Sequence, residues 1–441
     1  MSKIIKQYDL LSETPPVLNS RLPGFVKHAI SCVPDIAKCA AANAMFPPAE
    51  ALMHDVSCRY WDNSWYEPSG MEATVGPSGV GKGYIDPMIE CIIRSLSEHD
   101  KESERKLAEY NRICNTRGDN KDKPERPDDA AILVPEPDMT NAALVQLLMD
   151  AEREGNRSIY TMMPEIDMLD ECCASHKKVT RVIRLNFDSK RYGQQRATPK
   201  GITGKPTLRW KMNVSCVEQK ARDFFKGHLL DGTVGRFGFS LIPKPEKRET
   251  PIQGNYDEKY QQKLDTYLIR LINARGKFYI PQLNKLTLQL KDDMEELTDL
   301  AADGGVFESL WHRSLRVAWT KGCVLYLAED QRWTKEIGNF VVWSLYYDLW
   351  SKIRIFAPQM HKARSQEQVD VRKFGPSNML GELPQNFSQQ QLEQLRLSRG
   401  MPVYCAKQLR NWVDRGYINY SAQTGLYTKT EEYLKRHPNE T

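Results

Sequence analysis

A glycine-rich stretch has the most specific chemistry in this sequence: Gly76-Pro77-Ser78-Gly79-Val80-Gly81-Lys82-Gly83. It fits the pattern G-x-x-x-x-G-K, in which glycines let backbone N–H groups surround a phosphate and the lysine neutralises its charge. A short strand candidate, 71–75, precedes it, and a segment with one apolar face, as in a helix, follows it at 84–96. The stretch therefore predicts a loop that binds the phosphates of ATP through Gly76, Ser78, Gly79, Val80, Gly81, Lys82 and Gly83; a chance glycine-rich turn is the alternative.

Two carboxylates provide the candidate catalytic and metal-binding groups. Glu165 and Asp167 follow an apolar strand candidate at 158–163. A phosphoryl-transfer site needs such carboxylates to orient the attacking water or to hold Mg²⁺. We assign these roles to Glu165 first and to Asp167 second; the alternative is that both only begin the following helix.

Two positions depart from the usual pattern. Gly83 stands where a serine or threonine normally ligates Mg²⁺, and Pro164 stands where an aspartate is usual. Mg²⁺ would then have to be held by carboxylates further along the chain. A site with weak hydrolysis is an alternative that the same residues leave open.

Two more polar residues lie in or before strand candidates. Asn213, in the candidate at 208–217, could contact the γ-phosphate, or it could be a satisfied amide in the core. Arg236 lies between a glycine-containing turn and the candidate at 236–242. It is a candidate arginine finger that would complete the site of a neighbouring subunit.

A basic segment indicates a nucleic-acid partner. Between His176 and Lys211 there are eleven basic residues and one acidic residue. Glycines and prolines within it predict a mobile loop. Basic side chains with one aromatic ring suit a phosphate backbone and a stacked base, so we predict DNA contacts from Lys190, Arg191, Tyr192, Arg196, Lys200 and Lys205. A solvated loop or a contact with an acidic partner is the alternative.

The C-terminal part predicts a winged helix. Ser388 and Gln391 form a capping box, a second helix follows with Val403, Ala406, Leu409 and Val413 inward, and a hairpin surrounds Gly425. Exposed groups on the second helix could enter a DNA groove: Lys407, Gln408 and Asn411. Docking of another protein is the alternative.

Composition sets the limits for these predictions. The chain has 441 residues, 40% hydrophobic and 27% charged, with a net charge of +5, as in ordinary globular proteins. No apolar run reaches the ~18 residues that would cross a bilayer, so we expect no integral membrane protein. Ten cysteines without a C-x-x-C pair are typical of reduced thiols in a cytoplasmic protein.

Apolar strand candidates alternate with helices and predict an α/β fold with a mainly parallel sheet. The strand candidates are 71–75, 131–134, 158–163, 208–217 and 236–242, and one of the intervening helices is 141–151. We divide the chain into an N-terminal helical region (1–70), a P-loop core (71–245), a helical lid (246–375) and the winged helix (376–441).

Over about residues 20–430 the sequence resembles the helicase-like P-loop ATPases of phages, plasmids and integrative conjugative elements, which often accompany primases. The resemblance rests on GPSGVGKG, ILVPEPDMTNAALVQLL, SIYTMMPEIDML, RYGQQRATP, DGTVGRF and the winged-helix tail. It implies a RecA/AAA-like core that uses ATP and Mg²⁺. It also implies a homo-oligomeric ring, such as a hexamer, on single-stranded or forked DNA. Lys82 would contact phosphate, Glu165 would be catalytic, and Arg236 would act across a subunit interface.

The expected function is that of an ATP-dependent DNA helicase or translocase in the replication or mobilisation of a mobile element, with a primase or replication-initiation protein as partner. Two alternatives stay open. One is a nucleotide-gated DNA-binding protein with a degenerate ATPase site, which Gly83 and Pro164 favour. The other is a P-loop phosphotransferase, because nucleotide kinases also tolerate glycine after the loop lysine.

Overall fold

The computed structural model describes residues 8–10, 12–116, 124–172, 176–196, 201–228, 231–245, 250–300, 306–374, 377–398 and 403–436. The chain divides into two compact units, Met1–Met360 and His361–Thr441. One continuous hydrophobic core extends from Phe25 to Phe356. The predicted boundaries at 70 and 245 therefore do not separate compact units.

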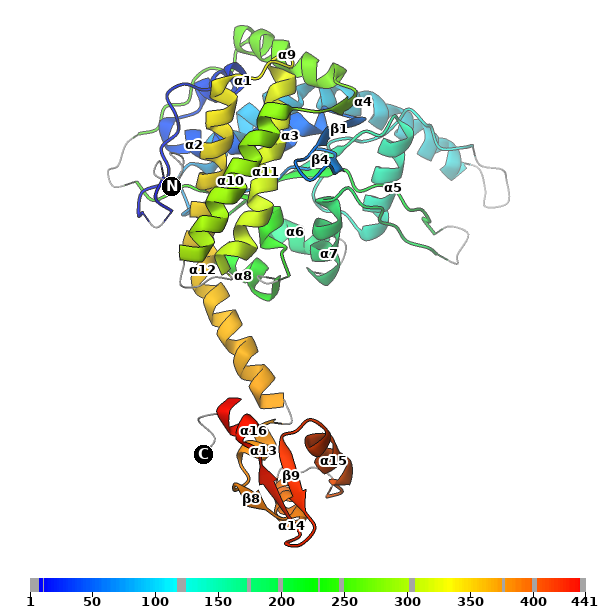
Figure 1. Cartoon of the computed structure of the whole chain (residues 1–441). Helices are drawn as coiled ribbons and strands as arrows, with labels where there is room; N and C mark the ends of the chain where they lie inside the picture. Colours follow the sequence, from blue (N-terminus) through cyan, green and yellow to red (C-terminus); the bar gives the residue numbers. More distant parts are fainter. Residues whose placement is uncertain are drawn as a thin grey trace. The chain divides into compact units, whose positions relative to one another are not determined.

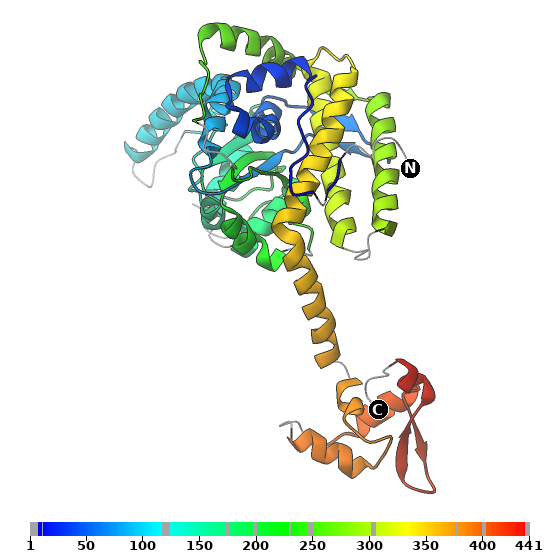
Figure 2. The same cartoon turned by 90° about the vertical axis from the view of Figure 1, so that its left-hand side faces the viewer.

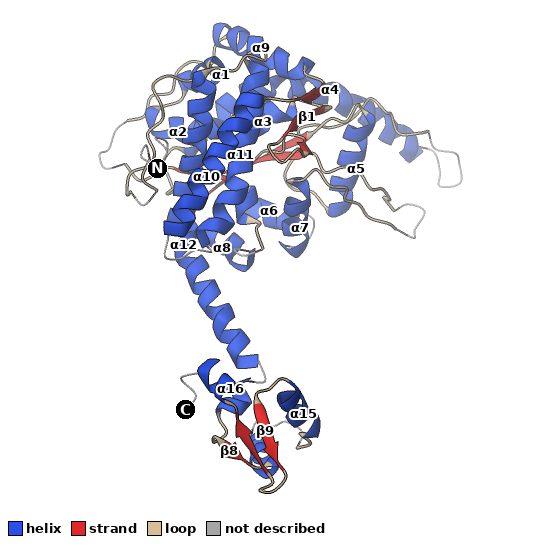
Figure 3. Cartoon of the chain, viewed as in Figure 1, coloured by secondary structure: helices blue, strands red, loops and turns tan. Residues whose placement is uncertain are grey.

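A parallel four-stranded sheet lies inside the first unit (Figure 3). Its order is β4 (Ile159–Met163), β5 (Trp210–Cys216), β3 (Met71–Val75) and β6 (Gly238–Leu241). All three pairings are parallel. These strands are buried on both faces, as parallel strands usually are, although β3 and β5 also carry buried polar residues such as Glu72 and Asn213. The predicted α/β class and four of the five predicted strands are confirmed.

The fifth predicted strand, 131–134, does not form, because carboxylates bind the N–H groups that a ladder would need. Asp100 accepts from the N–H groups of Leu133 (2.8 Å) and Val134 (2.7 Å), and Glu154 accepts from that of Ala131 (2.9 Å). One ladder-like bond remains, from Tyr160 N–H to the Leu133 carbonyl (2.7 Å). The segment therefore lies along β4 as an irregular chain.

Two helices cover one face of the sheet, and a third helix packs on one of these two (Figure 1). They are α2 (Asp35–Ala44), α3 (Phe46–Ala51) and α4 (Asp86–Thr116). Helix α2 contacts β3 and β6, α3 contacts β4 and β5, and α4 packs on α3. The far half of α4 is mostly exposed and projects from the first unit (cyan in Figure 2), in agreement with its charged sequence.

Helices α8 (Glu218–Phe225) and α12 (Lys335–Phe374) pack against the opposite face. Phe225 of α8, Phe239 of β6 and Phe356 of α12 stack edge to face, with centroids 5.0–5.7 Å apart. Helix α12 also covers the edge of β6. The N–H of Phe239 donates to Asp348 Oδ1 (2.7 Å), and the N–H of Leu241 donates to Ser351 Oγ (3.0 Å).

The remaining elements of the first unit surround this sandwich. The helices are α1 (Gly24–Ala29), α5 (Asn141–Arg153), α6 (Asp167–Glu171), α7 (His176–Asn186), α9 (Glu258–Asn273), α10 (Pro281–Leu300) and α11 (Val306–Ala328). A small sheet has the order β2 (Trp65–Tyr66), β1 (Val56–Arg59), β7 (Gly276–Phe278). Helices α9–α11, predicted as part of a lid, contribute side chains to the same core as the sheet. Among the described residues, no helix is long and apolar enough to cross a membrane.

The second unit has its own small core around Leu392, Leu409 and Trp412. Its elements follow the predicted order of two helices and a hairpin: α13 (Ser377–Gly381), β8 (Asn386–Phe387), α14 (Gln389–Ser398), α15 (Ala406–Asp414), β9 (Ile418–Ser421), β10 (Leu426–Lys429) and α16 (Glu431–Arg436). The capping box is confirmed. Ser388 N–H donates to Gln391 Oε1 (2.8 Å), and Gln391 N–H donates to Ser388 Oγ (3.4 Å).

The inward face of α15 differs from the prediction. Leu409 and Trp412 are buried, whereas Val403 and Val413 are 46% and 40% exposed. Trp412 is larger than valine and lies one position earlier on the helix, so it takes the place in the core. The predicted inward positions of Val403 and Val413 are therefore wrong.

Candidate functional site

The glycine-rich loop begins where the inner strand β3 ends, between β5 and β6. Gly76 N–H donates to the carbonyl of Cys216, the last residue of β5 (3.1 Å). Gly79 and Gly81 have φ angles of +75° and +97°, which glycine adopts without strain. A Cβ on Gly81 would also lie 2.7 Å from the ring of Tyr84. Glycine is thus required by the path of this loop.

Lys82 folds back over the loop. Its Nζ donates to the carbonyl oxygens of Gly76 (2.9 Å) and Pro77 (3.1 Å). It is the first residue of a 3₁₀ turn, Lys82–Ile85, and α4 begins only at Asp86. Pro87 therefore lies in the first turn of α4, where a missing N–H costs nothing. The ammonium group is held where it can exchange carbonyl oxygens for those of a phosphate.

Glu165 and Asp167 follow β4, which β5 separates from β3. The charges of Glu165, Asp167 and Lys82 all act on the thiol of Cys216. Burial raises the pKa of Cys216 to about 12, with smaller effects from the positive Lys82, which lowers it, and from the negative Glu165 and Asp167, which raise it. The structure thus brings the loop lysine and both predicted carboxylates to the carboxyl end of β5.

Lys220 is a part of this site that sequence reasoning missed. It lies in the first turn of α8, and its Nζ donates to Asp167 Oδ2 (2.6 Å). That hydrogen bond raises the pKa of Lys220. Its position in the sequence could have identified Lys220. It comes soon after the end of β5, and β5 lies beside β3, the strand that precedes the glycine-rich loop.

The residues present suit Mg²⁺ only together with a nucleotide. Two carboxylates, with waters and substrate phosphates, are a usual ligand set for Mg²⁺. Gly83 adds no hydroxyl, and Asp167 is paired with Lys220. Among the described residues, no group of three or more His, Cys, Asp or Glu could hold a metal ion. Glu165 and Asp167 fit an ion that a phosphate chain helps to bind.

Asn213 does not reach the loop. Its Oδ1 accepts from the Tyr160 hydroxyl (2.9 Å), and its Nδ2 donates to the Ala44 carbonyl (3.0 Å). The side chain is buried against α2 and α3, where it satisfies a core carbonyl. Its predicted contact with the γ-phosphate is therefore wrong.

Arg236 lies two residues before β6, at the amino end of the sheet, whereas the loop is at the carboxyl end. Its Nη1 donates to the Gly232 carbonyl (2.9 Å), and its guanidinium lies over the ring of Phe187. Burial, with a contribution from the positive Arg313, lowers the pKa of Arg236 to about 10. Within one chain, Arg236 and Lys82 are therefore not part of the same site.

The basic segment forms a hairpin rather than an open loop. Antiparallel bridges pair Arg191 with Thr207 and Gln194 with Gly204. Four of its predicted DNA contacts are exposed, namely Lys190, Arg191, Arg196 and Lys205. Lys200 lies outside the described residues.

Tyr192, within this hairpin, was predicted to stack on a base. Its hydroxyl donates to Asn141 Oδ1, and its ring is partly buried against the core. The ring therefore supports the base of the hairpin.

The predicted DNA contacts of α15 differ in exposure. Lys407 and Asn411 are exposed. Gln408 is partly buried, accepts a hydrogen bond from Arg396, and points its Nε2 toward the sulfur of Met379. Gln408 thus joins the helices of the second unit, and its predicted place on the exposed side is wrong.

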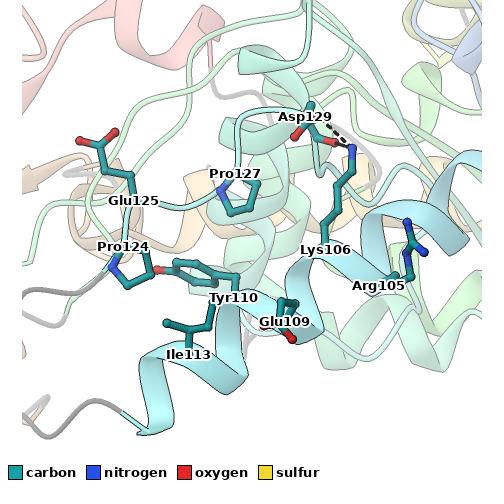
Figure 4. A pocket seen from close by; sticks show the side chains of 9 residues that line it. All are labelled: Arg105, Lys106, Glu109, Tyr110, Ile113, Pro124, Glu125, Pro127 and Asp129. Carbon is teal, nitrogen blue, oxygen red and sulfur yellow. Dashed lines mark hydrogen bonds and ion pairs between the residues drawn. The ribbon is translucent and has the colours of Figure 1, made fainter.

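A separate hollow of about 620 Å³ lies between α4 and residues 124–129 (Figure 4). The ring of Tyr110 lies beside Pro124, and Lys106 forms an ion pair with Asp129 (2.7 Å). Its charges are largely paired, and it contains none of the residues predicted from the sequence for catalysis or binding.

Comparison with known proteins adds no family. No protein-family model matches the chain, and no curated protein sequence matches it.

Proposed function

We propose that the protein binds and hydrolyses ATP at residues 76–83 and couples this cycle to work on DNA, as a helicase or translocase does. The observation that carries the proposal is the glycine loop at the end of the inner strand β3, closed by Lys82. Glu165 and Asp167 follow β4 at the same end of the sheet. This arrangement supports a RecA/AAA-like P-loop core.

A cavity beside the loop has room for the rest of a nucleotide. It measures about 890 Å³ and is lined by residues of 31–38, by Pro245 and by residues 250–254. Gln253, in its wall, donates to the carbonyl of Tyr84 in the turn that follows the loop (3.3 Å). With phosphates at Lys82, the base and ribose would lie in this cavity against its prolines and aliphatic side chains.

The chain's own groups divide the work of hydrolysis. Lys82 neutralises phosphate charge, and the exposed carboxylate of Glu165 accepts the proton of the attacking water. Glu165 and Asp167 would hold Mg²⁺, which would supply further neutralisation of the phosphates. Lys220 forms an ion pair with Asp167 and orients its carboxylate.

DNA binding is assigned to two surfaces, each within its own unit. The hairpin presents Lys190, Arg191, Arg196 and Lys205 to solvent, which suits the phosphates of single-stranded or forked DNA. The second unit has the element order of a winged helix, and its exposed Lys407 and Asn411 suit a groove.

Assembly and biological role complete the proposal. Arg236, at the far end of the sheet from its own loop, would act on the nucleotide of a neighbouring copy in a ring such as a hexamer. The role is replication or mobilisation of a mobile element, with a primase or replication-initiation partner. The nine described cysteines are all free, which supports a cytoplasmic location.

One observation favours a second candidate, a DNA-binding protein gated by nucleotide without turnover. Asp167 is paired with Lys220, and Gly83 and Pro164 remove two usual metal ligands. In that case nucleotide would still bind at Lys82 and alter DNA affinity.

Lys82→Ala tests the nucleotide site. Removing a charge-assisted contact should weaken ATP binding by about ten- to a hundredfold, measured with a fluorescent ATP analogue. Lys259→Ala, at an exposed lysine of α9, is the matched control and should bind as wild type does. Equal affinity in the Lys82 and control variants would exclude the loop as the phosphate site.

Glu165→Gln separates the two candidates. If the protein is an ATPase, this variant should bind ATP normally and lose most of its turnover, with and without single-stranded DNA. If wild type itself has no turnover but ATP changes its DNA affinity, the gated DNA-binding protein is correct.

A further inference from the structure

A third cavity, of about 380 Å³, lies near the amino end of β6 and is rich in arginine. Its wall combines residues from β1–β2, the end of α7, the turn before β6, and α11: Tyr60, Phe187, Asp188, Arg236, His312, Arg313 and Arg316. Three of these residues are arginines and only one is acidic. None of the roles proposed above uses the cavity itself.

The acidic residue is already neutralised. Arg316 Nη1 donates to Asp188 Oδ1 (2.6 Å), and its Nη2 donates to the Phe187 carbonyl (2.8 Å). The guanidinium lies 3.6 Å from the ring centroid of Tyr66 and 4.3 Å from that of Phe187. These contacts fix Arg316 in the wall of the cavity, and its ion pair neutralises the charge of Asp188.

The next carboxylate is neutralised as well. Asp231 forms an ion pair with Arg184, is hydrogen-bonded through Oδ2 to Nδ1 of His228 (2.7 Å), and accepts from the hydroxyl of Thr233 (2.6 Å). No charge from these two carboxylates is left to balance the other arginines of the cavity.

Arg313 and Arg236 are the uncompensated pair. Among the described residues, no hydrogen bond or ion pair involves the Arg313 guanidinium, and Arg236 Nε is buried without a hydrogen-bond partner. Arg313 lies directly over Gly232, where a Cβ would be 2.8 Å from its Cζ. Because Gly232 has no Cβ, the guanidinium of Arg313 can approach its backbone. The guanidinium groups of Arg313 and Arg236 therefore line the same small cavity.

We propose that this cavity binds a phosphate group, through the guanidinium N–H groups of Arg313 and Arg236. Arginine is the residue best suited to planar recognition of phosphate, and two adjacent positive charges are stabilised by one doubly charged anion. The phosphate could belong to a small molecule or to a nucleic-acid backbone, which share this chemistry. The site is formed by one chain, so it does not depend on the oligomer that the role of Arg236 as a finger requires.

The test uses full-length protein carrying Lys82→Ala, so that the glycine loop does not contribute. Inorganic phosphate is titrated at constant ionic strength against chloride, and binding is measured calorimetrically. We expect saturable binding that Arg313→Gln weakens at least about tenfold, as loss of a charge-assisted hydrogen bond should. Arg236→Gln should have a similar effect, and Arg313→Lys should recover part of the affinity.

Arg332→Gln, at an arginine whose side chain is 79% exposed, is the matched control and should bind phosphate unchanged. Circular dichroism checks that each variant is folded. Equal phosphate affinity in the Arg313→Gln and control variants, or no phosphate binding in any of them, would overturn the proposal. If Lys82→Ala leaves ATP binding unchanged, the proposed ATP site is excluded. The phosphate-binding result still stands in that case, because the glycine loop and the arginine cavity share no residue.

A competition arm identifies the source of the phosphate. If a short single-stranded oligonucleotide displaces inorganic phosphate, and Arg313→Gln lowers the salt slope of oligonucleotide binding by about one unit, the site takes a backbone phosphate. If pyrophosphate displaces it and the oligonucleotide does not, the site takes a small phosphorylated ligand. Either result supports the proposal.

Discussion

Two buried ion pairs lie beside the sheet. Glu72 of β3 and Lys321 of α11 are 3% and 2% exposed, and their charged groups lie 2.5 Å apart. Lys321 also donates to Asn43 (2.8 Å), and Lys352 pairs with Asp348 within α12 (2.7 Å). The sheet and the helical region behind it are thus joined by ions as well as by apolar contacts.

Lys321→Met should destabilise the first unit strongly. It leaves Glu72 buried without its cation, and breaking such a pair costs about 3–5 kcal/mol. The free energy of unfolding from urea denaturation measures this cost. Adding Glu72→Gln should recover part of it, and a double variant as unstable as the single one would contradict this explanation.

Glu50 predicts a pH dependence of stability. Burial raises the pKa of Glu50 to about 7. The negative Glu72 also raises this pKa, whereas the positive Lys211 and Lys321 lower it. Between about pH 4.5 and pH 7 the folded state keeps a proton that the unfolded state has lost, so the free energy of unfolding falls as pH rises. Above pH 7 this contribution is constant.

Glu50→Gln removes that titration. Across the same window, wild type should lose about 1–3 kcal/mol relative to the variant, with the difference growing as pH rises. Denaturation midpoints of both proteins at pH 5, 6, 7 and 8 measure it. A constant difference would mean that Glu50 keeps an ordinary pKa.

In the proposed function, Lys220 would compete with Mg²⁺ for Asp167. Its side chain is about half exposed, so solvent screens this ion pair and keeps it weak. Lys220→Ala should therefore lower the Mg²⁺ concentration for half-maximal ATP turnover by at most about fivefold. The same substitution at exposed Lys226 is the control. A higher Mg²⁺ requirement would instead assign Lys220 a direct role with the nucleotide.

At the scale of single elements, the cap of α14 can be tested alone. Ser388→Ala removes the side-chain acceptor for the Gln391 N–H and should cost about 1 kcal/mol. Faster amide exchange confined to residues 389–398 would measure this loss. Gln389→Ala, which removes an exposed contact with Glu393, should change exchange much less.

The strands show what a sequence can and cannot predict. Residues 159–163 were predictable because a parallel strand buried on both faces forms a mainly apolar run, and residues 71–75 because they lead directly into the glycine-rich turn. The run 131–134 is also apolar, yet Asp100 and Glu154 bind its N–H groups. Those carboxylates lie 20 or more residues away along the chain, so no local pattern could reveal the competition.

The candidate site divides in the same way. The glycine positions and Lys82 were predictable because backbone geometry dictates residue type there. The position of Asn213 was not predictable. Alternation along a strand shows which residues share a face with Asn213, but it does not show which face of the sheet is near the loop. Lys220 becomes informative only once β4 and β5 are known to be neighbours.

At the scale of the whole molecule, the two units have cores without a shared residue. A fragment comprising residues 1–360 should therefore fold and keep the ATP affinity of the full chain within about twofold, because the loop and the cavity beside it lie in the first unit. Thermal unfolding and nucleotide titration of the fragment measure both. An aggregated fragment, or one without a cooperative transition, would show that the first unit needs residues beyond 360.

Two N–H groups of β6, those of Phe239 and Leu241, donate to side chains of α12, more than a hundred residues later in the chain. On the ribosome, β6 emerges long before Asp348 and Ser351 are synthesised. During that interval the nascent sheet has an unpaired edge, which invites pairing with other chains. Chaperones that hold nascent chains should accordingly associate with this protein most strongly while residues 242–351 are being translated. Stop codons introduced within that interval should produce insoluble products.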